Sequence, residues 1–599
     1  MVNMDKLTSF QEIFNNIAVK QPKTIAVSYM NKYITYGELN EKAKGLANYL
    51  RKIGIEREKR VAIICERNIE TIIGIVAILK AGGAYVPIDS SLPYERKKFI
   101  IEDSMPTAIL IGNAKLDDAV PVPIINLFNS ELYIHSDDVC IQSDPNDLAL
   151  IIYTSGTTGN PKGVMIEYSR FIKNKIHFEN YLKITDKDVI LQFASLSYAA
   201  SFEEITMALL SGSELCTIPY EIILDTKYFE QYIIEHKISV LMLPPQYLLN
   251  FNNLSVKKII TAGGAATIDI ISHISRFSEY YNNFGSSEIG MMAWWSLSRN
   301  VSNEIIPLGK PINNTTIYIS DGNRLCSVME KGEICITGVG MARGYLNQPE
   351  LTSEKFVKNP FGEGIIYKTG DFGRWLPDGN MEYLGRIDEQ IEIQGHRIEI
   401  REIENVIKKQ PSVKDCAVIS KEYEDNEKII CAFVVGNELD TFVLKKSLLN
   451  ILPEYMVPSH MVNVEEIPLN KNGKIDKIKL SNFDITAMND CVEEKNTMEV
   501  LIGNAFCQIL KLNAIGLDNN FFELGGHSLR AIKLINKIEA DTGIRISLKI
   551  LFANPTVRQI SQYLNELSID DYEPIPKVED REYYPMSSTQ KRIYLINQI

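Results

Sequence analysis

The sequence lacks several features that would otherwise restrict its function class. Its formal net charge of −13 gives no excess of Lys and Arg for nonspecific contact with nucleic acid or an anionic membrane. Its nine cysteines include no CxxC pair, which argues against a zinc site and a disulfide framework. No uncharged apolar run reaches about 18 residues, and the N-terminus shows no signal-peptide pattern. These absences indicate a cytoplasmic protein with neither nucleic acid nor a membrane as partner.

The 599 residues are too many for one hydrophobic core, and the pattern along the chain divides them. From residue 24 to residue 388, β-branched runs such as VAIICE alternate with amphipathic helical patterns, which is typical of parallel sheets with crossover helices. GRIDEQIEIQGHRIEI then changes to period-two alternation, which favours a small, partly antiparallel sheet. We therefore expect an α/β chain with a large subdomain at 1–388 and a small α+β subdomain at 389–485.

A helical module is expected after the small subdomain. The polar segment ITAMNDCVEEKN predicts a linker, placed at 486–495. TMEVLIGNAFCQILKL and SLRAIKLINKIEADTG show helical spacing and place the module at 496–570. Residues 571–599 follow as a separate segment, whose acidic, proline-bearing first part is expected to be extended.

A loop rich in Gly, Ser and Thr follows a strand pattern in IIYTSGTTGNPKG, residues 151–163. Glycines let backbone N–H groups approach phosphate oxygens, hydroxyl groups add donors, and Lys162 adds a cation. The loop does not follow the GxxxxGK[ST] order, so a P-loop nucleoside triphosphatase is disfavoured. Loops of this composition are more often only turns, but this length and order predict ATP binding by Thr154, Ser155, Gly156, Thr157, Thr158 and Gly159.

A series of motifs makes the chain resemble the adenylate-forming superfamily and, within it, the adenylation domains of nonribosomal peptide synthetases. In chain order they are ITYGEL, LKAGGAYVPID, YTSGTTGNPKG, NNFGSSEIG, GEICITGVGMARGY, YKTGDFGRWLPDG, GRIDEQIEIQGHRIE, LPEYMVP and NKNGKIDK. The resemblance implies that a carboxylic acid reacts with ATP to give an acyl adenylate and pyrophosphate, and that the acyl group then passes to a carrier thiol. It also implies that the small subdomain is mobile.

The resemblance assigns three catalytic residues. Lys474 in NGKID would contact carboxylate and phosphate oxygens during adenylation, and Lys162 would add fixed positive charge. Glu288 in NNFGSSE would help to hold Mg²⁺ with the triphosphate. Family members more often have Pro and Thr where this chain has Ser286 and Ser287, so the chain loses some turn rigidity here.

The nucleotide and hinge residues follow from the same resemblance. Phe284 would stack on adenine, and Asp371, with Arg386 nearby, would hold the ribose. Asp388 in GRID would be the hinge, about which the small subdomain rotates to withdraw Lys474 and bring the IQGHRIE loop to the site. Outside the motifs, each of these residues would be an ordinary surface or turn residue. Tyr168, where the family commonly has His, is a further departure.

The stretch DNNFFELGGHSLRAIKLINKI, residues 518–538, resembles a peptidyl carrier protein, which implies a four-helix bundle. Ser528 would be modified by a phosphopantetheinyl transferase to carry a 4′-phosphopantetheine arm, whereas a serine at a helix start is otherwise usually an N-cap. YYPMSSTQKRIYLINQI resembles the opening of a condensation domain, so we expect a downstream condensation domain as a partner. The chain would then be an adenylation and carrier didomain from a larger protein, compatible with an initiation module.

The acid-binding pocket departs from the amino-acid-activating pattern. Such members carry an aspartate in an FDAS motif, where it pairs with the substrate's α-ammonium. Aligning SYAASFEE on that motif places Ala199 at the aspartate position, so an α-ammonium would be buried without a counter-charge. The same alignment places Glu203 on the helical face of Ala200, pointing into the pocket. The resemblance assigns the other wall positions to Met242, Ile260, Ala262, Asn283, Met291 and Met292.

An aliphatic acyl tail would leave Glu203 buried and unpaired, which is unfavourable. We therefore expect an acid with an amine or another donor away from C2, such as a β- or ω-amino acid. The usual β-amino pattern has an acid at the position of Ala200, and this chain departs from it. An α-hydroxy, α-keto or aryl acid stays open, because it also needs no aspartate and a neighbouring side chain or water can satisfy Glu203. Glu204 is expected to be structural.

Two other functions compete with acid activation and carrier loading. A stand-alone acyl-CoA ligase would need no carrier serine, so Ser528 argues against it. A catalytically silent scaffold that only presents a carrier would not need Lys162, Glu288, Asp371 and Lys474. The sequence therefore predicts an ATP-dependent acid–thiol ligase that forms AMP.

Overall fold

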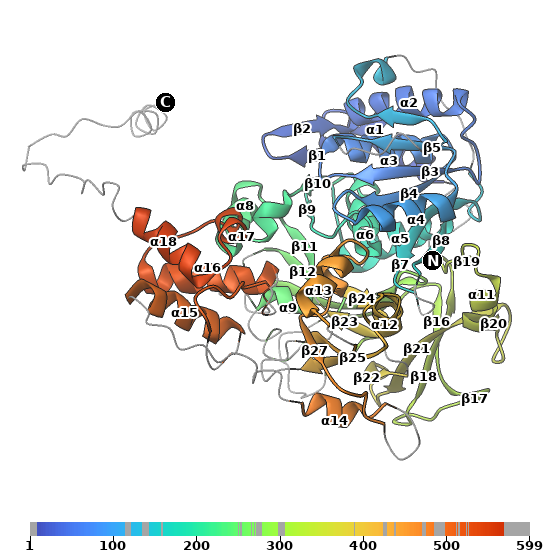
Figure 1. The fold of residues 1–599 in the computed structure, drawn as a ribbon. Helices are drawn as coiled ribbons and strands as arrows, with labels where there is room; N and C mark the ends of the chain where they lie inside the picture. Colours follow the sequence, from blue (N-terminus) through green and yellow to red (C-terminus); the bar gives the residue numbers. More distant parts are fainter. Residues whose placement is uncertain are drawn as a thin grey trace, which may run out of the picture. The chain divides into compact units, whose positions relative to one another are not determined.

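The computed structural model describes most of the chain, in two compact units, Met1–Ile485 and Thr486–Ile599 (Figure 1). The described residues are 9–113, 121–134, 143–156, 160–249, 251, 254, 256–264, 266, 268, 270, 278–296, 306–387, 390–393, 395–422, 428–436, 439–469, 475–483, 497–510, 512, 515–522, 524, 526 and 528–567.

The first sheet of the larger unit carries the phosphate loop. Its order is β19-β8-β7-β4-β3-β5-β6, with parallel pairing from β7 to β6 and antiparallel pairing of β7, β8 and β19. The helices near it include α3, which begins where the Asn68 side chain accepts the N–H of Thr71. The strands are β3 (Arg60–Cys65), β4 (Ala84–Asp89), β5 (Ala108–Ile111), β6 (Ile124–Asn126), β7 (Leu148–Thr154), β8 (Lys162–Glu167) and β19 (Gly344–Tyr345), and the helices of this part are α1 (Phe10–Lys20), α2 (Tyr36–Lys52), α3 (Ile69–Lys80), α4 (Tyr94–Ser104) and the 3₁₀ helix η2 (Ser130–Tyr133).

The second sheet carries the predicted acid-binding wall. Its order is β15-β14-β13-β12-β11-β9-β10-β1-β2, parallel from β13 to β1 and antiparallel at both edges. Its strands are β1 (Ile25–Tyr29), β2 (Lys32–Thr35), β9 (Val189–Gln192), β10 (Glu214–Thr217), β11 (Val240–Leu243), β12 (Lys258–Thr261), β13 (Glu279–Ser286), β14 (Gly290–Ser296) and β15 (Lys310–Pro311), and the accompanying helices are α5 (Ser169–His177), the π-helix η3 (Phe178–Leu182), α6 (Ala199–Leu209), α7 (Tyr220–Ile223), α8 (Thr226–Glu235) and α9 (Pro245–Leu248).

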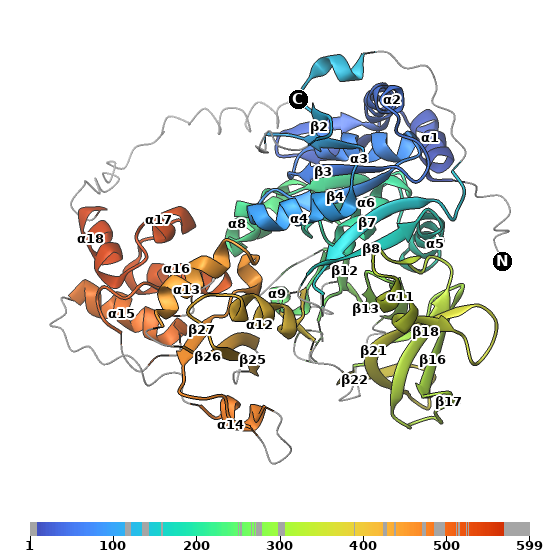
Figure 2. The same ribbon diagram turned by 45° about the vertical axis from the view of Figure 1, so that its right-hand side comes forward.

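A third sheet departs from the expected parallel pattern. Sequence periodicity predicted crossover helices as far as residue 388, but residues 315–386 form an antiparallel sheet (Figure 2). Turns such as that between β16 and β17 are too short for a crossover helix, so successive strands pair antiparallel. The strands are β16 (Thr315–Asp321), β17 (Arg324–Leu325), β18 (Gly332–Gly338), β20 (Phe356–Lys358), β21 (Ile365–Trp375) and β22 (Met381–Arg386), with one helix, α11 (Pro349–Lys355).

Residues 390–483 form the small lobe of the same unit. A hairpin of β23 (Ile391–Ile393) and β24 (His396–Ile398) precedes a three-stranded sheet of β25 (Asp415–Glu422), β26 (Lys428–Val435) and β27 (His460–Asn463). Ile403 and Ile407 of α12 pack with Leu448 in the lobe's own hydrophobic core. The helices are α12 (Ile400–Lys408), α13 (Thr441–Leu449), the 3₁₀ helix η4 (Glu454–Met456) and α14 (Lys477–Ser481).

The second unit contains four helices among its described residues: α15 (Thr497–Leu510), α16 (Ser528–Thr542), α17 (Leu548–Ala553) and α18 (Val557–Leu567). Phe506, Leu534, Leu551 and Ile560, one from each helix, share one buried apolar core. The predicted fold class, an α/β enzyme with a small α+β lobe and a helical carrier, is confirmed. Within the part of the chain that the structure describes, none of the helices has the length and apolar character needed to cross a membrane.

The two lobes of the larger unit meet at a buried ion pair. Arg96 of α4 binds the carboxylate of Glu402 at the start of α12, and the two residues are 8% and 1% exposed. Removing one partner of a buried pair leaves the other charge uncompensated. This ion pair therefore helps to hold the small lobe against the large lobe.

We predict that Arg96→Met loosens the small lobe, because an unpaired Glu402 would cost about 3–5 kcal/mol if it stayed buried. Hydrogen exchange measured by mass spectrometry should become faster in β23, β24 and α12. Lys97→Met is the matched control on the same helix, since the Lys97 amine contacts only the Ser90 carbonyl. Unchanged exchange in Arg96→Met would contradict the role given to the pair.

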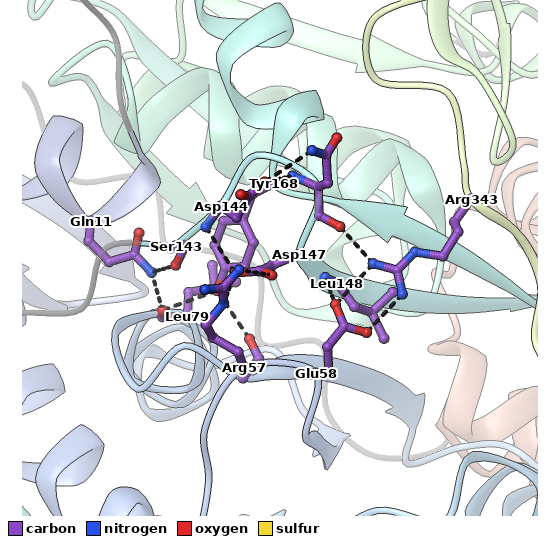
Figure 3. A network of polar contacts seen from close by, with 12 residues as sticks. Gln11, Arg57, Glu58, Leu79, Ser143, Asp144, Asp147, Leu148, Tyr168 and Arg343 are labelled. Carbon is purple, nitrogen blue, oxygen red and sulfur yellow. Dashed lines mark hydrogen bonds and ion pairs between the residues drawn. The ribbon is translucent and has the colours of Figure 1, made fainter. Parts of the chain in front are cut away.

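Tyr168, the departure from the family's histidine, belongs to a polar network behind the phosphate sheet (Figure 3). Its buried hydroxyl lies 3.1 Å from the carbonyl oxygens of both Leu79 and Gly83, at the C-terminal end of α3. Arg343 in the same network donates two hydrogen bonds to the carboxylate of Glu58. Tyr168 therefore supplies a hydrogen-bond donor to carbonyls at and just beyond the C-terminal end of α3, where the Leu79 carbonyl also accepts from the Gln11 amide.

We predict that Tyr168→Phe lowers stability by about 1 kcal/mol, because it removes one buried donor and keeps the ring. Scanning calorimetry should show a lower melting temperature for the larger unit, with unchanged acid activation. Tyr33→Phe is the control, since Tyr33 is 64% exposed. Equal melting temperatures of Tyr168→Phe and the wild type would refute the assignment.

Candidate active site

The phosphate loop leaves β7 at Thr154 and is described as far as Gly156. The Ser155 hydroxyl donates to the Arg397 carbonyl at 2.7 Å, and the Gly156 N–H donates to the Glu402 carboxylate at 3.0 Å. A Cβ on Gly156 would lie 2.0 Å from the Asn160 carbonyl oxygen, so only glycine fits this close turn. The Thr154 hydroxyl is buried and has no partner among the described residues. The predicted residues Thr157, Thr158 and Gly159 lie outside the described residues.

Glu288 is the centre of a buried cluster of charge. Its side chain is fully buried, with Arg397 at 3.0 Å and the Lys162 amine at 3.5 Å. The Tyr345 hydroxyl donates to Glu288 at 2.9 Å. Burial alone would raise the pKa of Glu288, but the charges of Arg397 and Lys162 outweigh burial and hold this pKa well below its usual range. Glu288 is therefore an ionised carboxylate beside the phosphate loop.

Lys162 stands at the start of β8, directly across from Thr154 at the end of β7. It is 3% exposed, and burial lowers its pKa to about 8, with Arg397 acting in the same direction and Glu288 opposing the shift. The structure thus brings the predicted catalytic residues Lys162 and Glu288 together. Lys474 lies outside the described residues, so its position stays a prediction.

The predicted ribose-binding pair lies on neighbouring strands. Asp371 of β21 is paired in register with Arg386 of β22, and their side chains form an ion pair at 2.9 Å. Burial raises the pKa of Asp371, although Arg386 opposes this shift. Phe284 of β13 is half-buried beside a separate apolar cluster that includes Ile289 and Met292. The expected hinge residue, Asp388, lies outside the described residues.

The small lobe presents its β23–β24 hairpin to the site. His396 Nδ1 lies 2.6 Å from the Tyr198 hydroxyl, and the His396 ring stacks on Tyr455 with centroids 4.0 Å apart. Gly395 approaches so closely that a Cβ on Gly263 would lie 3.2 Å from its Cα. The IQGHRIE loop is therefore at the site in this structure, as expected for one of the two lobe orientations. Arg397 and Glu402 were missed from the sequence, although the motif GHRIE contains the first of them.

Most predicted wall residues of the acid pocket meet in one apolar cluster. Ala199 and Ala200 begin α6 and pack against it, as does Ala262. Met292 points to the opposite face of β14 from Met291, because side chains alternate along a strand, and it packs with Ile289 and Ile334. Three other predicted wall residues belong to the apolar cluster that Ala199, Ala200 and Ala262 pack against: Met242, Ile260 and Met291.

Two polar wall residues carry acceptor atoms without a partner. Glu203 is 4% exposed, and one of its oxygens accepts a hydrogen bond from the Asn174 amide. Its other oxygen, Oε1, and Oδ1 of Asn283 are buried and have no hydrogen-bond partner among the described residues. Burial raises the pKa of Glu203 to about 7, with Arg170 and Lys173 opposing the shift. Glu204, in contrast, accepts the N–H of Ala194 at 3.2 Å, as a structural residue does.

The remaining site predictions concern metal and carrier. Among the described residues, no group of three or more His, Cys, Asp or Glu side chains is arranged to hold a metal ion. The ionised Glu288 carboxylate is the kind of oxygen ligand that suits Mg²⁺. In the second unit, α16 begins at Ser528, which agrees with the predicted helix start.

Three family models match the chain. Residues 14–346 match the AMP-binding enzyme family, residues 402–474 match the AMP-binding enzyme C-terminal domain, and residues 501–564 match the phosphopantetheine attachment site. Lys474 is the last residue of the second match, and Ser528 lies within the third. The expected start of a condensation domain, residues 571–599, lies outside all three matches and outside the described residues.

Curated relatives are multidomain synthetases. Gramicidin S synthase 1 of Brevibacillus brevis is 39% identical over 93% of this chain and 52% of its own length. Surfactin synthase subunit 2 of Bacillus subtilis (strain 168) is 37% identical over 98% of this chain and 17% of its own length. Tyrocidine synthase 2 of Brevibacillus parabrevis is 38% identical over 99% of this chain and 17% of its own length. The chain thus spans about half, or less, of each of these relatives.

Two solved structures are similar to the chain. A holo nonribosomal peptide synthetase protein containing adenylation and PCP domains, bound to a vinylsulfonamide inhibitor, has a TM-score of 0.83 at 23% identity, covering 94% of this chain and 98% of that chain. At this identity the likeness concerns the fold alone. A holo four-domain nonribosomal peptide synthetase bound to AMP and glycine has a TM-score of 0.60 at 29% identity, covering 96% of this chain and 43% of that chain. The chain therefore belongs to the AMP-binding enzyme family, and it also contains a region that matches the phosphopantetheine attachment site.

Proposed function

We propose that the chain activates a carboxylic acid with ATP and loads it on its own carrier domain. The acid's carboxylate oxygen attacks the α-phosphorus of ATP, the bond to pyrophosphate breaks, and an acyl adenylate forms. The thiolate of a 4′-phosphopantetheine arm on Ser528 then attacks the acyl carbon, and AMP leaves with the electron pair of the broken C–O bond. The observation that carries this proposal is the buried, ionised Glu288 with Lys162 beside a phosphate loop, in one chain with a carrier domain.

Each residue contributes position or fixed charge, which is most of what such a reaction needs. Lys162 would place its positive charge at the phosphate oxygens, and Asp371 would accept hydrogen bonds from the ribose hydroxyls. Glu288 would hold Mg²⁺, which neutralises charge on the triphosphate. Lys474 would bind the acid's carboxylate and the α-phosphate from the small lobe.

The small lobe would alternate between two orientations about Asp388. In the orientation that the structure describes, Glu402 accepts the Gly156 N–H and Arg397 neutralises Glu288. Both groups occupy positions that the triphosphate and its Mg²⁺ would use, so this orientation suits the step after pyrophosphate has left. Adenylation would need Arg397 to withdraw and Lys474 to enter, which is the expected rotation.

The substrate proposed is an acid without a charged α-amino group and with a hydrogen-bond donor further out, such as a β- or ω-amino acid. Ala199 offers no charge to an α-ammonium, and burying an ammonium without one is unfavourable. Glu203 Oε1 and Asn283 Oδ1 are buried acceptors without a described partner, and a donor on the substrate would satisfy both. An α-hydroxy, α-keto or aryl acid is the second candidate, since it too needs no aspartate at position 199.

The proposed partners follow from the carrier. A phosphopantetheinyl transferase would attach the arm to Ser528, and a downstream condensation domain would take the acyl group from it. The names of the relatives reported above refer to gramicidin S, surfactin and tyrocidine, which supports the proposal of a role in peptide synthesis.

We predict that the phosphopantetheinylated chain gains the mass of an acyl group when it is incubated with ATP, Mg²⁺ and a suitable acid. Intact-mass spectrometry should show no gain for Ser528→Ala, because the thiol is absent, and a loss of about 100-fold in rate for Lys474→Ala. Acyl-CoA formation by Ser528→Ala would instead support an acyl-CoA ligase. A chain that releases no pyrophosphate with any of the acids tested would support a silent scaffold.

We predict that pyrophosphate release is fastest with β- or ω-amino acids and at least about tenfold slower with the matching L-α-amino acids. Glu203→Gln should slow release with the amino acids more than with a des-amino acid of equal length, and Ala199→Asp should increase release with L-α-amino acids. Glu179→Gln is the control, since its side chain is 47% exposed. If an L-α-amino acid proves to be the best substrate of the wild type, the assignment of the pocket residues is wrong.

A further inference from the structure

Helix α5 buries an unusual set of polar side chains between α6, which bears Glu203, and the turn between β13 and β14, which bears Glu288. Arg170, Lys173 and Asn174 are 1%, 3% and 2% exposed. Buried Lys and Arg side chains are rare in proteins unless a partner holds them. Their partners therefore show what α5 does.

Arg170 binds three backbone carbonyls at once. Its Nε donates to the Gly340 carbonyl at 2.6 Å, and its two terminal nitrogens donate to the carbonyls of Ser287 at 2.8 Å and Glu288 at 3.0 Å. Lys173, one helical turn further on, donates to the Ile289 carbonyl at 3.3 Å. The two cations thus hold three successive carbonyls of the turn between β13 and β14, which is the turn that bears Glu288.

This turn has few contacts of its own. The Ile289 N–H donates to the Ser286 carbonyl at 3.2 Å, and the turn closes on Gly290 with a φ of +65°. The Ser286 hydroxyl is buried without a partner among the described residues, so its own side chain does not brace the turn. The turn must nevertheless orient the Glu288 side chain toward Lys162. The carbonyl contacts from α5 restrict the backbone of this turn and so help to fix that orientation.

Glu203 supplies the opposite charge for the two cations. Glu203 Oε1 and Arg170 Nε each lie 3.3 Å from the point where a Cβ on Gly290 would stand, so both side chains border Gly290. Burial lowers the pKa of Lys173 to about 7 and that of Arg170 to about 10, and in both the negative charge of Glu203 opposes the shift. Asn174 donates to Glu203 and fixes its other oxygen.

We propose that Arg170 and Lys173 are positioning residues that fix the Glu288 turn for Mg²⁺-bound ATP, with the Glu203 carboxylate as a nearby negative charge that favours both cations. This inference rests on the proposed function, because it is there that Glu288 receives Mg²⁺. It adds that one carboxylate of the acid pocket and the metal-binding carboxylate are joined through α5.

The test measures the affinity of the full chain for the non-cleavable ATP analogue α,β-methylene-ATP by calorimetry, with Mg²⁺ and with EDTA. We expect the wild type to bind more tightly with Mg²⁺. In Arg170→Met and Lys173→Met, this gain should fall by about tenfold, because Glu288 is misplaced, while affinity in EDTA stays within about twofold. Arg170→Lys should recover part of the gain. Lys175→Met is the matched control on α5, since Lys175 contacts Glu179 and the Leu210 carbonyl.

A second set of variants separates the effect of Glu203 on Arg170 and Lys173 from its proposed role toward the acid substrate. The titration contains no acid, so Glu203→Gln can reduce the Mg²⁺ gain only through the two cations, and Glu203→Asp should restore part of it. Equal weakening with and without Mg²⁺, in variants that melt normally, would show a merely structural role and overturn the inference. An unaltered Mg²⁺ gain in both methionine variants would do the same. A wild type that does not bind the analogue would overturn the proposed function as well, so the two failures are distinguishable.

Discussion

A carboxylate that is completely buried has to be surrounded by positive charge, and the structure around Glu288 follows from this constraint. Lys162 reaches it from the strand after the phosphate loop, and Arg397 reaches it from the small lobe. Arg170 holds the backbone of the same residue from behind. Without these groups the low dielectric of the interior would protonate Glu288, and a neutral acid would neither hold Mg²⁺ nor pair with a cation.

The same constraint explains why a mobile lobe can share the site with a nucleotide. Arg397 and Glu402 offer the large lobe a cation for Glu288 and an acceptor for the Gly156 N–H. A triphosphate with Mg²⁺ offers the same two kinds of group. In the proposed function each large-lobe group would accept only one of these partners at a time, so lobe orientation and nucleotide state would be linked. The buried pair of Arg96 with Glu402 adds stability to the orientation described.

The sequence was sufficient to predict the residues whose chemistry is local to a motif. Lys162, Glu288, Asp371 and Arg386 lie in short ordered motifs, and the structure brings them together in pairs. The antiparallel sheet of residues 315–386 was not predicted, because single strands of parallel and antiparallel sheets look alike and only pairing separates them. Met291 and Met292 pack in different apolar clusters because side chains alternate along β14, so the role of Met292 as a wall residue stays a prediction.

Arg170 and Lys173 could not have been predicted, for a physical reason. On a helix that reads as amphipathic, cations are normally on the solvated face, and the carbonyls that receive these two are more than a hundred residues away in sequence. The burial of Arg170 and Lys173 also changes the interpretation of Glu203. If Glu203 has both proposed roles, toward the acid and toward the two cations, its exchange to suit a new acid would also disturb the turn that bears Glu288. Under these proposals, substrate choice and metal-binding geometry would be constrained together.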